Sequence, residues 1–592
     1  MKKNIMQLTV ATLLISSVVG CGSNEQSVET VAEPSVEVAA EAVADTVMPT
    51  SANLPSYMTT DLFTEKDFVT TYEAHSTITL ADGATTSDDE SVSVEGDIVT
   101  ITQGGAYVLT GVLSDGQILV DCADTDEVHL IFDNVDIKNE MMSAVLINGA
   151  GHVHITLNDG TSNVISSVIS MITSFESGAI SSSSPLTING TGALEINAVD
   201  GSGIVGLDDI TIISGDYEIV AGTNGIDTFG ALKIADANMY VQTNYYGFYI
   251  GDMDNTADPS VGFVHIVDGN YSLQTANAAI FASNYIAIEN GTLDVYTGQD
   301  GFYTAHSVYL GAPSVSMETV ACGIFAAENT TIEDANLDIQ NVVCAIDSQT
   351  IDINGGTTNI TAHNEALYAN ASDVSKEAYI NITGGMLMMN GNFLTNGLNS
   401  SGEITISGGE ILSSSMSAYD FSPNSPLADS LLGNTASVTG GTLLVTGSLG
   451  MQVQNFDTNS TQSTIFIILE EPQEGVFTLT DSAGATHAEM TTPKPYQTIL
   501  ISLPTLEIGE EYTLTTPTET RTILLEELVY IDAMLPPARE EGELPEGQMP
   551  MGERPEGEMP MGELPEGQMP MGERPEGEMP MGGQPQGGQP PQ

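Results

Sequence analysis

Aromatic residues recur along the middle of the chain with a spacing that can present them side by side. The series consists of Tyr249, Phe281, Tyr303, Phe325 and Tyr368. An apolar residue precedes each, so on a β-strand that neighbour points inward and the ring outward. A row of rings can stack on sugar rings while nearby Asn and Asp bind the hydroxyls. The series predicts a carbohydrate-binding strip. The alternative is a structural ladder of rings, covered by the insertion at 252–262.

Cationic side chains are scarce, and this argues against catalysis. A polysaccharide lyase needs Arg or Lys to remove a proton and cations to stabilise the resulting charge. The chain has no Arg before Arg521, and between Glu65 and Pro493 it has only four Lys. A hydrolase needs paired carboxylates at a fixed gap, and no motif singles out such a pair. We expect a non-catalytic protein, with a cryptic polysaccharide lyase or glycoside hydrolase as an alternative.

Two further pairs of residues could do chemistry. His152 and His154 lie on one face of an expected strand and could bind a metal, although such a pair more often faces solvent. Cys322 and Cys344 are one repeat apart, close enough for a disulfide outside the cell. Two stacked free thiols are the alternative that we favour.

Internal repeats provide the elements that position these residues. Units begin at Ile210, Leu232, Val264, Ile286 and Val308, and most later units also start 20 to 24 residues apart. Each unit contains two short runs of alternating β-branched residues separated by Gly, Asn or Asp, as in strands joined by turns. One unit cannot bury its apolar face alone, so the units must stack in parallel, about 4.8 Å apart.

Superposing the units gives two apolar columns with a mostly polar column between them. The first apolar column is Tyr217, Met239, Tyr271, Leu293, Val315 and Leu337. The second is Ile219, Val241, Leu273, Val295, Met317 and Ile339. This register predicts an all-β fold, a right-handed single-stranded parallel β-helix with about 22 residues per coil. A β-sandwich or propeller would not keep one register over six units.

The ends of the chain differ from the repeat. Lys2 and Lys3, a short apolar stretch and Val18 to Cys21 are typical of a lipoprotein signal peptide, cleaved before a lipidated Cys21. The expected organisation is a signal peptide (1–20), a disordered tether (21–60), the β-helix (61–455), a small C-terminal β cap (456–535) and a disordered tail of Glu/Gly/Met/Pro decapeptide repeats (536–592).

The charge of the chain restricts its partners. Asp and Glu number 80 against 11 Lys and Arg, giving a net charge of −69. This surface repels phosphate backbones, which excludes nucleic acid, and attracts divalent cations. No later stretch is apolar enough to span a bilayer, so the lipid is the expected membrane anchor. We expect a monomer on the extracellular face.

Several segments of the chain resemble a known family. The matching segments are Ile101–Gly111, Gly116–Asp121, Leu130–Ile137, Ile155–Asn163 and Leu186–Leu194. They are similar to the secreted bacterial carbohydrate-binding proteins whose clostridial founder is a calcium-containing parallel β-helix related to polysaccharide lyases. The resemblance runs from about Ser76 to Thr516 and implies binding of cellulose-like or acidic polysaccharide.

The resemblance also implies calcium, but the chain departs from the family here. In the family, Asp-Gly-Ile recurs in coil after coil and carboxylates help to hold calcium, whereas only two of nine residues in the corresponding column are acidic here. Calcium needs six to eight oxygen ligands. Candidate ligands are Asp200, Asp208, Asp209, Asp227 and Asp300. The alternative role for these residues is turn formation or solvation.

These observations predict a surface-anchored, non-catalytic protein that binds polysaccharide. A different class of function is also compatible with them. The repeat would then be a rigid spacer in an adhesin or structural surface protein, and the acidic tail would make the contact.

Overall fold

The structure is a computed structural model that describes Pro55, Met58 and residues 62–532, apart from 169–176, 253–257, 372–375, 392–395, 415–416, 421–434, 448–455 and 457–458. The predicted signal peptide, Cys21, most of the tether and the repeat tail lie outside the described residues. The described chain is nearly all β, with one turn of 3-10 helix named η1 (Glu65–Phe68). It contains no apolar helix of membrane-spanning length.

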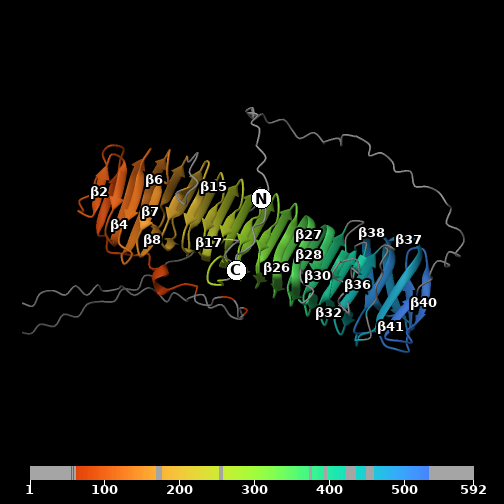
Figure 1. The fold of residues 1–592 in the computed structure, drawn as a ribbon. Helices are drawn as coiled ribbons and strands as arrows, with labels where there is room; N and C mark the ends of the chain where they lie inside the picture. The colour runs from red at the N-terminus through yellow and green to blue at the C-terminus, as the bar shows by residue number, and fades with distance from the viewer. Residues whose placement is uncertain are drawn as a thin grey trace, which may run out of the picture. The chain divides into compact units, whose positions relative to one another are not determined.

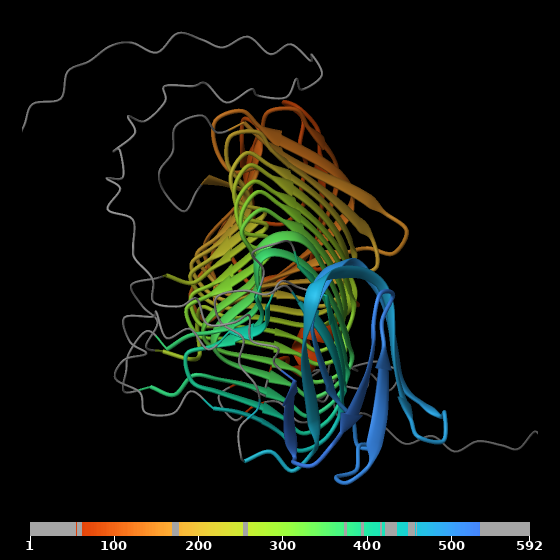
Figure 2. The same ribbon diagram turned by 90° about the vertical axis from the view of Figure 1, so that its right-hand side faces the viewer.

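Most strands form three rows, each row making one face of the stack (Figures 1 and 2). Seven long strands bend from one face to the next, or serve two faces in turn: β4 (Gly105–Leu113), β6 (Glu127–Asn139), β17 (Leu232–Thr243), β19 (Val264–Thr275), β26 (Cys322–Ile332), β27 (Asn336–Ile353) and β28 (Thr357–Ala369). The first face also contains β9 (Ser162–Ser167), β12 (Ala193–Ala198), β15 (Asp216–Ala221), β22 (Thr292–Thr297), β25 (Ser314–Thr319), β30 (Met386–Gly391), β33 (Glu410–Ser414) and β36 (Thr442–Gly447).

The other two faces are built in the same way. The second face contains β3 (Ile98–Ile101), β5 (Gln117–Asp121), β7 (Val145–Gly149), β10 (Gly178–Ser182), β13 (Ser202–Gly206), β16 (Ile226–Thr228), β18 (Phe248–Ile250), β20 (Ile280–Ala282), β23 (Phe302–Thr304), β31 (Asn396–Ser400) and β34 (Ser417–Asp420). The third contains β1 (Ser76–Leu80), β8 (His152–Leu157), β11 (Leu186–Gly190), β14 (Ile210–Ile212), β21 (Tyr285–Ile288), β24 (Ser307–Leu310), β29 (Tyr379–Ile382), β32 (Glu403–Ile406) and β35 (Ala436–Val438).

Strands of successive turns pair in parallel, and their register matches the predicted columns. Leu293 pairs with Val315, and Val315 pairs with Leu337. All three side chains are buried, whereas Asp294, which follows Leu293, is exposed. The stacking of residues one turn apart is therefore confirmed, and one continuous apolar core runs through the stack.

Glycine allows the chain to turn where successive turns approach most closely. Gly356 has a φ of +75°, which residues other than glycine rarely adopt. A Cβ at this position would lie 2.1 Å from the carbonyl oxygen of Ala335 in the preceding turn. The backbone can therefore pack this tightly only around a residue without a side chain.

The pairing changes at both ends of the stack. Near the N-terminus β2 (Val92–Glu95) pairs antiparallel with β3. After the repeat, β37 (Thr464–Asp481) pairs antiparallel with β38 (Thr486–Ser502), and β39 (Glu511–Thr515) pairs antiparallel with β40 (Thr520–Leu524). Finally β41 (Val529–Asp532) pairs parallel with β37. These strands have a small apolar core of their own but belong to the same compact unit as the stack.

Candidate functional site

The predicted aromatic residues do form a row on the second face. Tyr249, Phe281, Tyr303 and Phe325 are successive partners in the parallel pairing of β18, β20, β23 and β26. The distances between the ring centroids of neighbours are 4.6, 5.7 and 4.8 Å, with interplanar angles of 12° to 17°. The apolar residue before each ring is fully buried, as the alternation predicts.

The orientation of these rings limits what they can bind. Because neighbouring rings are stacked face to face, each covers the face of the next and mainly an edge is left for a ligand. Tyr246 also packs against Phe281, which is only 4% exposed. Phe281 therefore belongs to the outward row as expected but is covered by its neighbours, and the centre of the row has the geometry of the structural ladder given as the alternative. Tyr249, Tyr303 and Phe325 are half-buried.

A largely covered cluster of one carboxyl and two thiols continues the same row, with Cys344 buried and Cys322 and Asp347 half-buried. Asp347 takes the place of a ring between Phe325 and Tyr368, which is half-buried. Ligand atoms of Asp347, Cys322 and Cys344 lie within 4.8 Å of one another, and both cysteines are free thiols, the alternative that we favoured. Burial, together with the charge of Asp300, raises the pKa of Asp347 to about 6.

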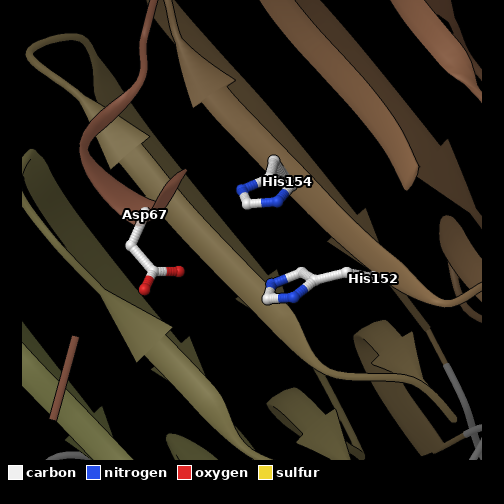
Figure 3. Close-up of side chains that lie close together, drawn as sticks. All are labelled: Asp67, His152 and His154. Carbon is white, nitrogen blue, oxygen red and sulfur yellow. The ribbon is translucent and has the colours of Figure 1, made fainter. Parts of the chain in front are cut away.

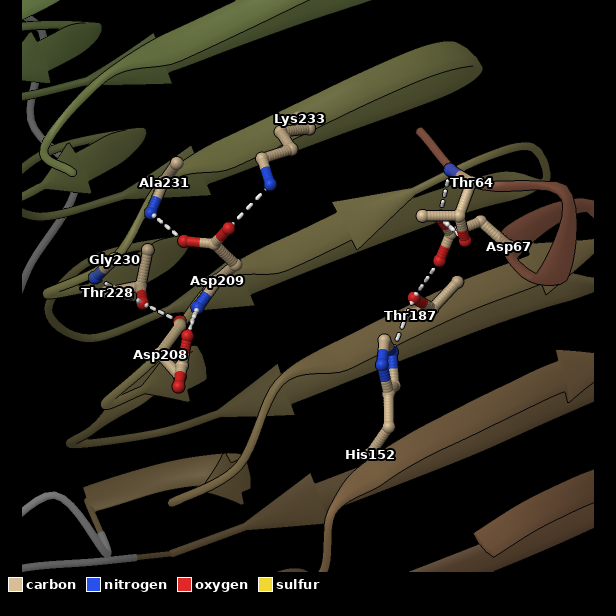
Figure 4. Close-up of polar contacts among 10 residues, drawn as sticks. All are labelled: Thr64, Asp67, His152, Thr187, Asp208, Asp209, Thr228, Gly230, Ala231 and Lys233. Carbon is tan, nitrogen blue, oxygen red and sulfur yellow. Dashed lines mark hydrogen bonds and ion pairs between the residues drawn. The ribbon is translucent and has the colours of Figure 1, made fainter. Parts of the chain in front are cut away.

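The structure does not bring together the five aspartates predicted as calcium ligands. Asp209 lies 2.5 Å from the ammonium of Lys233 and also accepts the backbone N–H of Ala231, so its carboxylate is already neutralised (Figure 4). Asp208 accepts the backbone N–H of Asp209 in an exposed turn. Two groups of three metal-ligating side chains occur among the described residues, and neither includes any of the five.

The other three aspartates lie apart from that turn. Asp227 is on β16 and accepts a hydrogen bond from the side-chain amide of Asn224, and burial raises its pKa. Asp200 is on an exposed turn after β12. Asp300 accepts the backbone N–H of Cys322 at 2.9 Å, and burial raises its pKa. Asp300 lies close enough to Asp347 for its charge to raise the pKa of that carboxyl.

An open groove of ≈ 760 Å³ lies along the corner between the second and third faces. Polar residues from successive turns line it, among them Asn284, His306, Glu328, Gln349, Lys376, Glu377 and Tyr379. Their side chains are partly held by bonds such as the 3.2 Å ion pair from His306 to Glu328 and the 3.1 Å bond from Tyr379 to Asp352. Lys376, one of the four lysines between Glu65 and Pro493, lies in this groove.

Sequence reasoning missed this groove, although a signal for it exists. Four successive strand segments of the third face are each preceded in the sequence by a polar residue, and these residues are about 22 positions apart: Asn284, His306, Glu328 and Gln349. Superposing the turns as well as the strands would have revealed a polar column. The groove therefore offers hydrogen-bond donors and acceptors on several consecutive turns.

The histidine pair on β8 is not solvent-facing. His154 is only 1% exposed, because η1 and the chain around it cover this part of the third face (Figure 3). Its ring stacks on His152 at 4.3 Å and on His129 at 4.6 Å. Burial lowers the pKa of His154 to about 3 and that of His129 to about 4, so both rings are neutral at physiological pH.

Part of the chain is similar to known proteins. Residues 95–365 match a family model described as carbohydrate-binding domain-containing protein. The family resemblance is confirmed. A carbohydrate-binding domain-containing protein of Acetivibrio thermocellus is 29% identical over 216 residues, which are 35% of this chain and 74% of that relative. The family model, at residues 95–365, contains the aromatic row as far as Phe325 and most of the corner groove, but not Lys376, Glu377 or Tyr379.

A solved structure is also similar. It is the gadolinium derivative of a polysaccharide lyase-like protein from C. thermocellum, with 25% sequence identity to this chain. The similarity covers 45% of this chain and 98% of that one, with a TM-score of 0.36.

Proposed function

We propose that this protein is a cell-surface lipoprotein that binds polysaccharide without cleaving it. The binding domain is a right-handed, single-stranded parallel β-helix, and the parallel pairing of turns about 22 residues long supports this assignment. The family match over residues 95–365 supports a carbohydrate ligand. The signal peptide at residues 1–20, followed by Cys21, supports a lipid anchor as the only attachment to the membrane, and the protein acts as a monomer.

The corner groove carries the proposal. Its polar side chains repeat from turn to turn at about 4.8 Å, so a linear chain of sugars lying along it meets new hydrogen-bonding groups at each step. Sugar hydroxyls both donate and accept, which suits the mixture of Asn, Gln, Glu and Lys. A half-buried Tyr379 offers an aromatic surface.

The charge of the groove favours a neutral, cellulose-like chain over an acidic one. Glu328 and Glu377 line the groove together with Lys376, so the carboxylates outnumber the permanent cation. The net charge of −69 adds a repulsion that an acidic glycan would have to overcome. An acidic glycan would need Lys376 or a bridging divalent cation.

Changing Lys376 and Tyr379 to Ala together should weaken binding of the best glycan by about tenfold or more, because one charge-assisted hydrogen bond and one stacking surface are lost. The full chain, extracted in detergent, would be screened on a glycan array, and affinity for the strongest ligand then measured by calorimetry. Tyr296→Ala is the matched control, since Tyr296 is 62% exposed on the first face, away from the groove.

The same measurement separates the groove from the aromatic row. The row stays a predicted contact, so Tyr303→Ala with Phe325→Ala is the second variant. Loss of binding in this variant, with normal binding in the groove variant, would move the site to the row. A chain that binds no glycan at all would instead favour the adhesin or structural protein.

We propose that the protein is not an enzyme. The described chain has four lysines before Pro493. Three of them form ion pairs with carboxylates outside the groove: Lys66 with Glu127, Lys138 with Glu140 and Lys233 with Asp209. Lys376 lines the groove together with Glu328 and Glu377, and the sequence has no Arg before Arg521 that could assist it in catalysis. Release of unsaturated or reducing sugar ends would point to a lyase or hydrolase instead.

Calcium binding is part of the proposal, with Asp300 as the best placed of the predicted ligands. Its nearness to Asp347 supplies two carboxyls, and a calcium ion would offset their repulsion. Adding Ca²⁺ to metal-stripped protein should raise the melting temperature by several degrees, and much less in Asp300→Asn with Asp347→Asn. An equal rise in the double variant, or no rise in the parent chain, would argue against this site.

A further inference from the structure

Asp67, His152 and His154 form a compact group outside the proposed polysaccharide site. Asp67 belongs to η1, whereas both histidines belong to β8, so the group joins segments 85 residues apart. One ligand atom of each residue lies within 4.8 Å of the other two. Figure 3 shows the two imidazole rings side by side, with the carboxylate facing them.

The two histidines are arranged as in a strand-borne chelating pair. They are two residues apart on β8, so they project from the same side of the strand. Their rings are nearly parallel, at an interplanar angle of 10°. An ion binds an imidazole nitrogen in the plane of the ring, so one of the two stacked rings must rotate about its Cβ–Cγ bond to bring a nitrogen of each to a common point.

The hydrogen bonds fix which nitrogen of His152 is free to bind an ion. The Thr187 hydroxyl donates its single proton to Oδ1 of Asp67 at 2.7 Å, because an ionised carboxylate only accepts (Figure 4). The Thr187 oxygen therefore accepts from His152 Nε2, which lies 2.9 Å away. With its proton on Nε2, the neutral ring has an unprotonated lone pair on Nδ1.

His154 supplies the second nitrogen. Its Nδ1 is buried and has no hydrogen-bond partner. A buried polar atom without a partner destabilises the fold, so a ligand at this atom would offset a real loss. Asp67, 5% exposed, is held in place because its other oxygen accepts both the backbone N–H and the hydroxyl of Thr64.

We propose that Asp67, His152 and His154 bind a divalent transition-metal ion of the Zn²⁺ class. Two imidazoles and one carboxylate are the donors that Zn²⁺ prefers, whereas Ca²⁺ takes oxygen donors. The hydrogen bond from His152 to Thr187 is the kind of outer contact that orients a metal-bound histidine. The ion fastens η1 to the third face and so secures the N-terminal entry to the stack, independently of polysaccharide binding.

Cobalt provides a direct test, since Co²⁺ bound by nitrogen and oxygen in tetrahedral geometry absorbs visible light strongly. The metal-stripped full chain in detergent would be titrated with Co²⁺ in excess Ca²⁺, which occupies the acidic surface. One equivalent should give the tetrahedral spectrum, and one equivalent of Zn²⁺ should abolish it. Absence of this spectrum would overturn the proposal.

Variants locate the ion. His154→Gln and Asp67→Asn should each weaken Co²⁺ binding by at least tenfold, while His306→Gln, which removes an imidazole paired with Glu328, should leave it unchanged. If His154→Gln fails to fold, Asp67→Asn still decides, because Asp67 lies outside the strands of the stack. Unaltered binding in Asp67→Asn, or equal loss in His306→Gln, would refute the site.

Discussion

Replacing Phe302 with alanine is expected to lower the free energy of unfolding by about 3–5 kcal/mol. Phe302 is fully buried on β23, and its partners in the parallel register are Ile280 and Ile324, both also fully buried. Removing the ring leaves a cavity between turns. The backbone hydrogen bonds on both sides fix the spacing between the turns. The cavity therefore cannot close, and the lost packing is not recovered.

Urea unfolding followed by circular dichroism would measure this loss. Tyr296→Ala is the control, because Tyr296 is in the preceding strand of the same turn, β22, but is mostly exposed. The control should change stability by no more than about 0.5 kcal/mol. Equal midpoints for the two variants would mean that the ring of Phe302 is not packed between its neighbours as described.

Asp347→Asn is expected to remove a decline of stability between about pH 4 and pH 7. Burial and the charge of Asp300 raise the pKa of Asp347 from 3.8 to about 6 in the folded chain. The folded state therefore binds a proton in this range that the unfolded state has released, and stability falls as pH rises through the folded pKa. The difference of about two units corresponds to about 2–3 kcal/mol at most, reduced by residual solvent access.

Melting temperatures of the metal-stripped parent and variant across this pH range provide the measurement. Near pH 4 the melting temperatures of parent and variant should differ by a constant amount. On approaching pH 7 the variant should lose less stability than the parent. Asp294→Asn is the control, since Asp294 is on the exposed side of β22. Parallel pH curves for the parent and Asp347→Asn would contradict the proposed burial of the Asp347 carboxyl.

The stacked columns could be predicted from the sequence because alternation and repeat length together fix the position of a residue. Val315 lies between Leu293 and Leu337, as predicted. The same reasoning placed the aromatic residues in one row. It could not show that Phe281 is covered, because strand alternation gives the direction of a side chain and not what packs against it.

The two other sites depend on contacts that the repeat does not determine. The corner groove combines turn residues such as His306 and Gln349 with Lys376, which follows a segment outside the regular spacing. The burial of His154 depends on η1, which lies before the first strand of the stack and has no repeat signal. Sequence pattern predicts contacts within the repeat far better than contacts between the repeat and a segment outside it.

Each turn of the stack packs mainly against the turn before it and the turn after it, so a whole turn can be removed without disturbing the others. Joining Tyr285 directly to Val308 would delete one whole turn and leave both partners in register, because Tyr285 occupies the same position as Ser307 and Ile286 the same position as Val308. Such a change removes His306 from the groove and shortens it by one step of about 4.8 Å. Deleting or adding whole turns would therefore change the length of the groove in fixed increments, without redesigning the core.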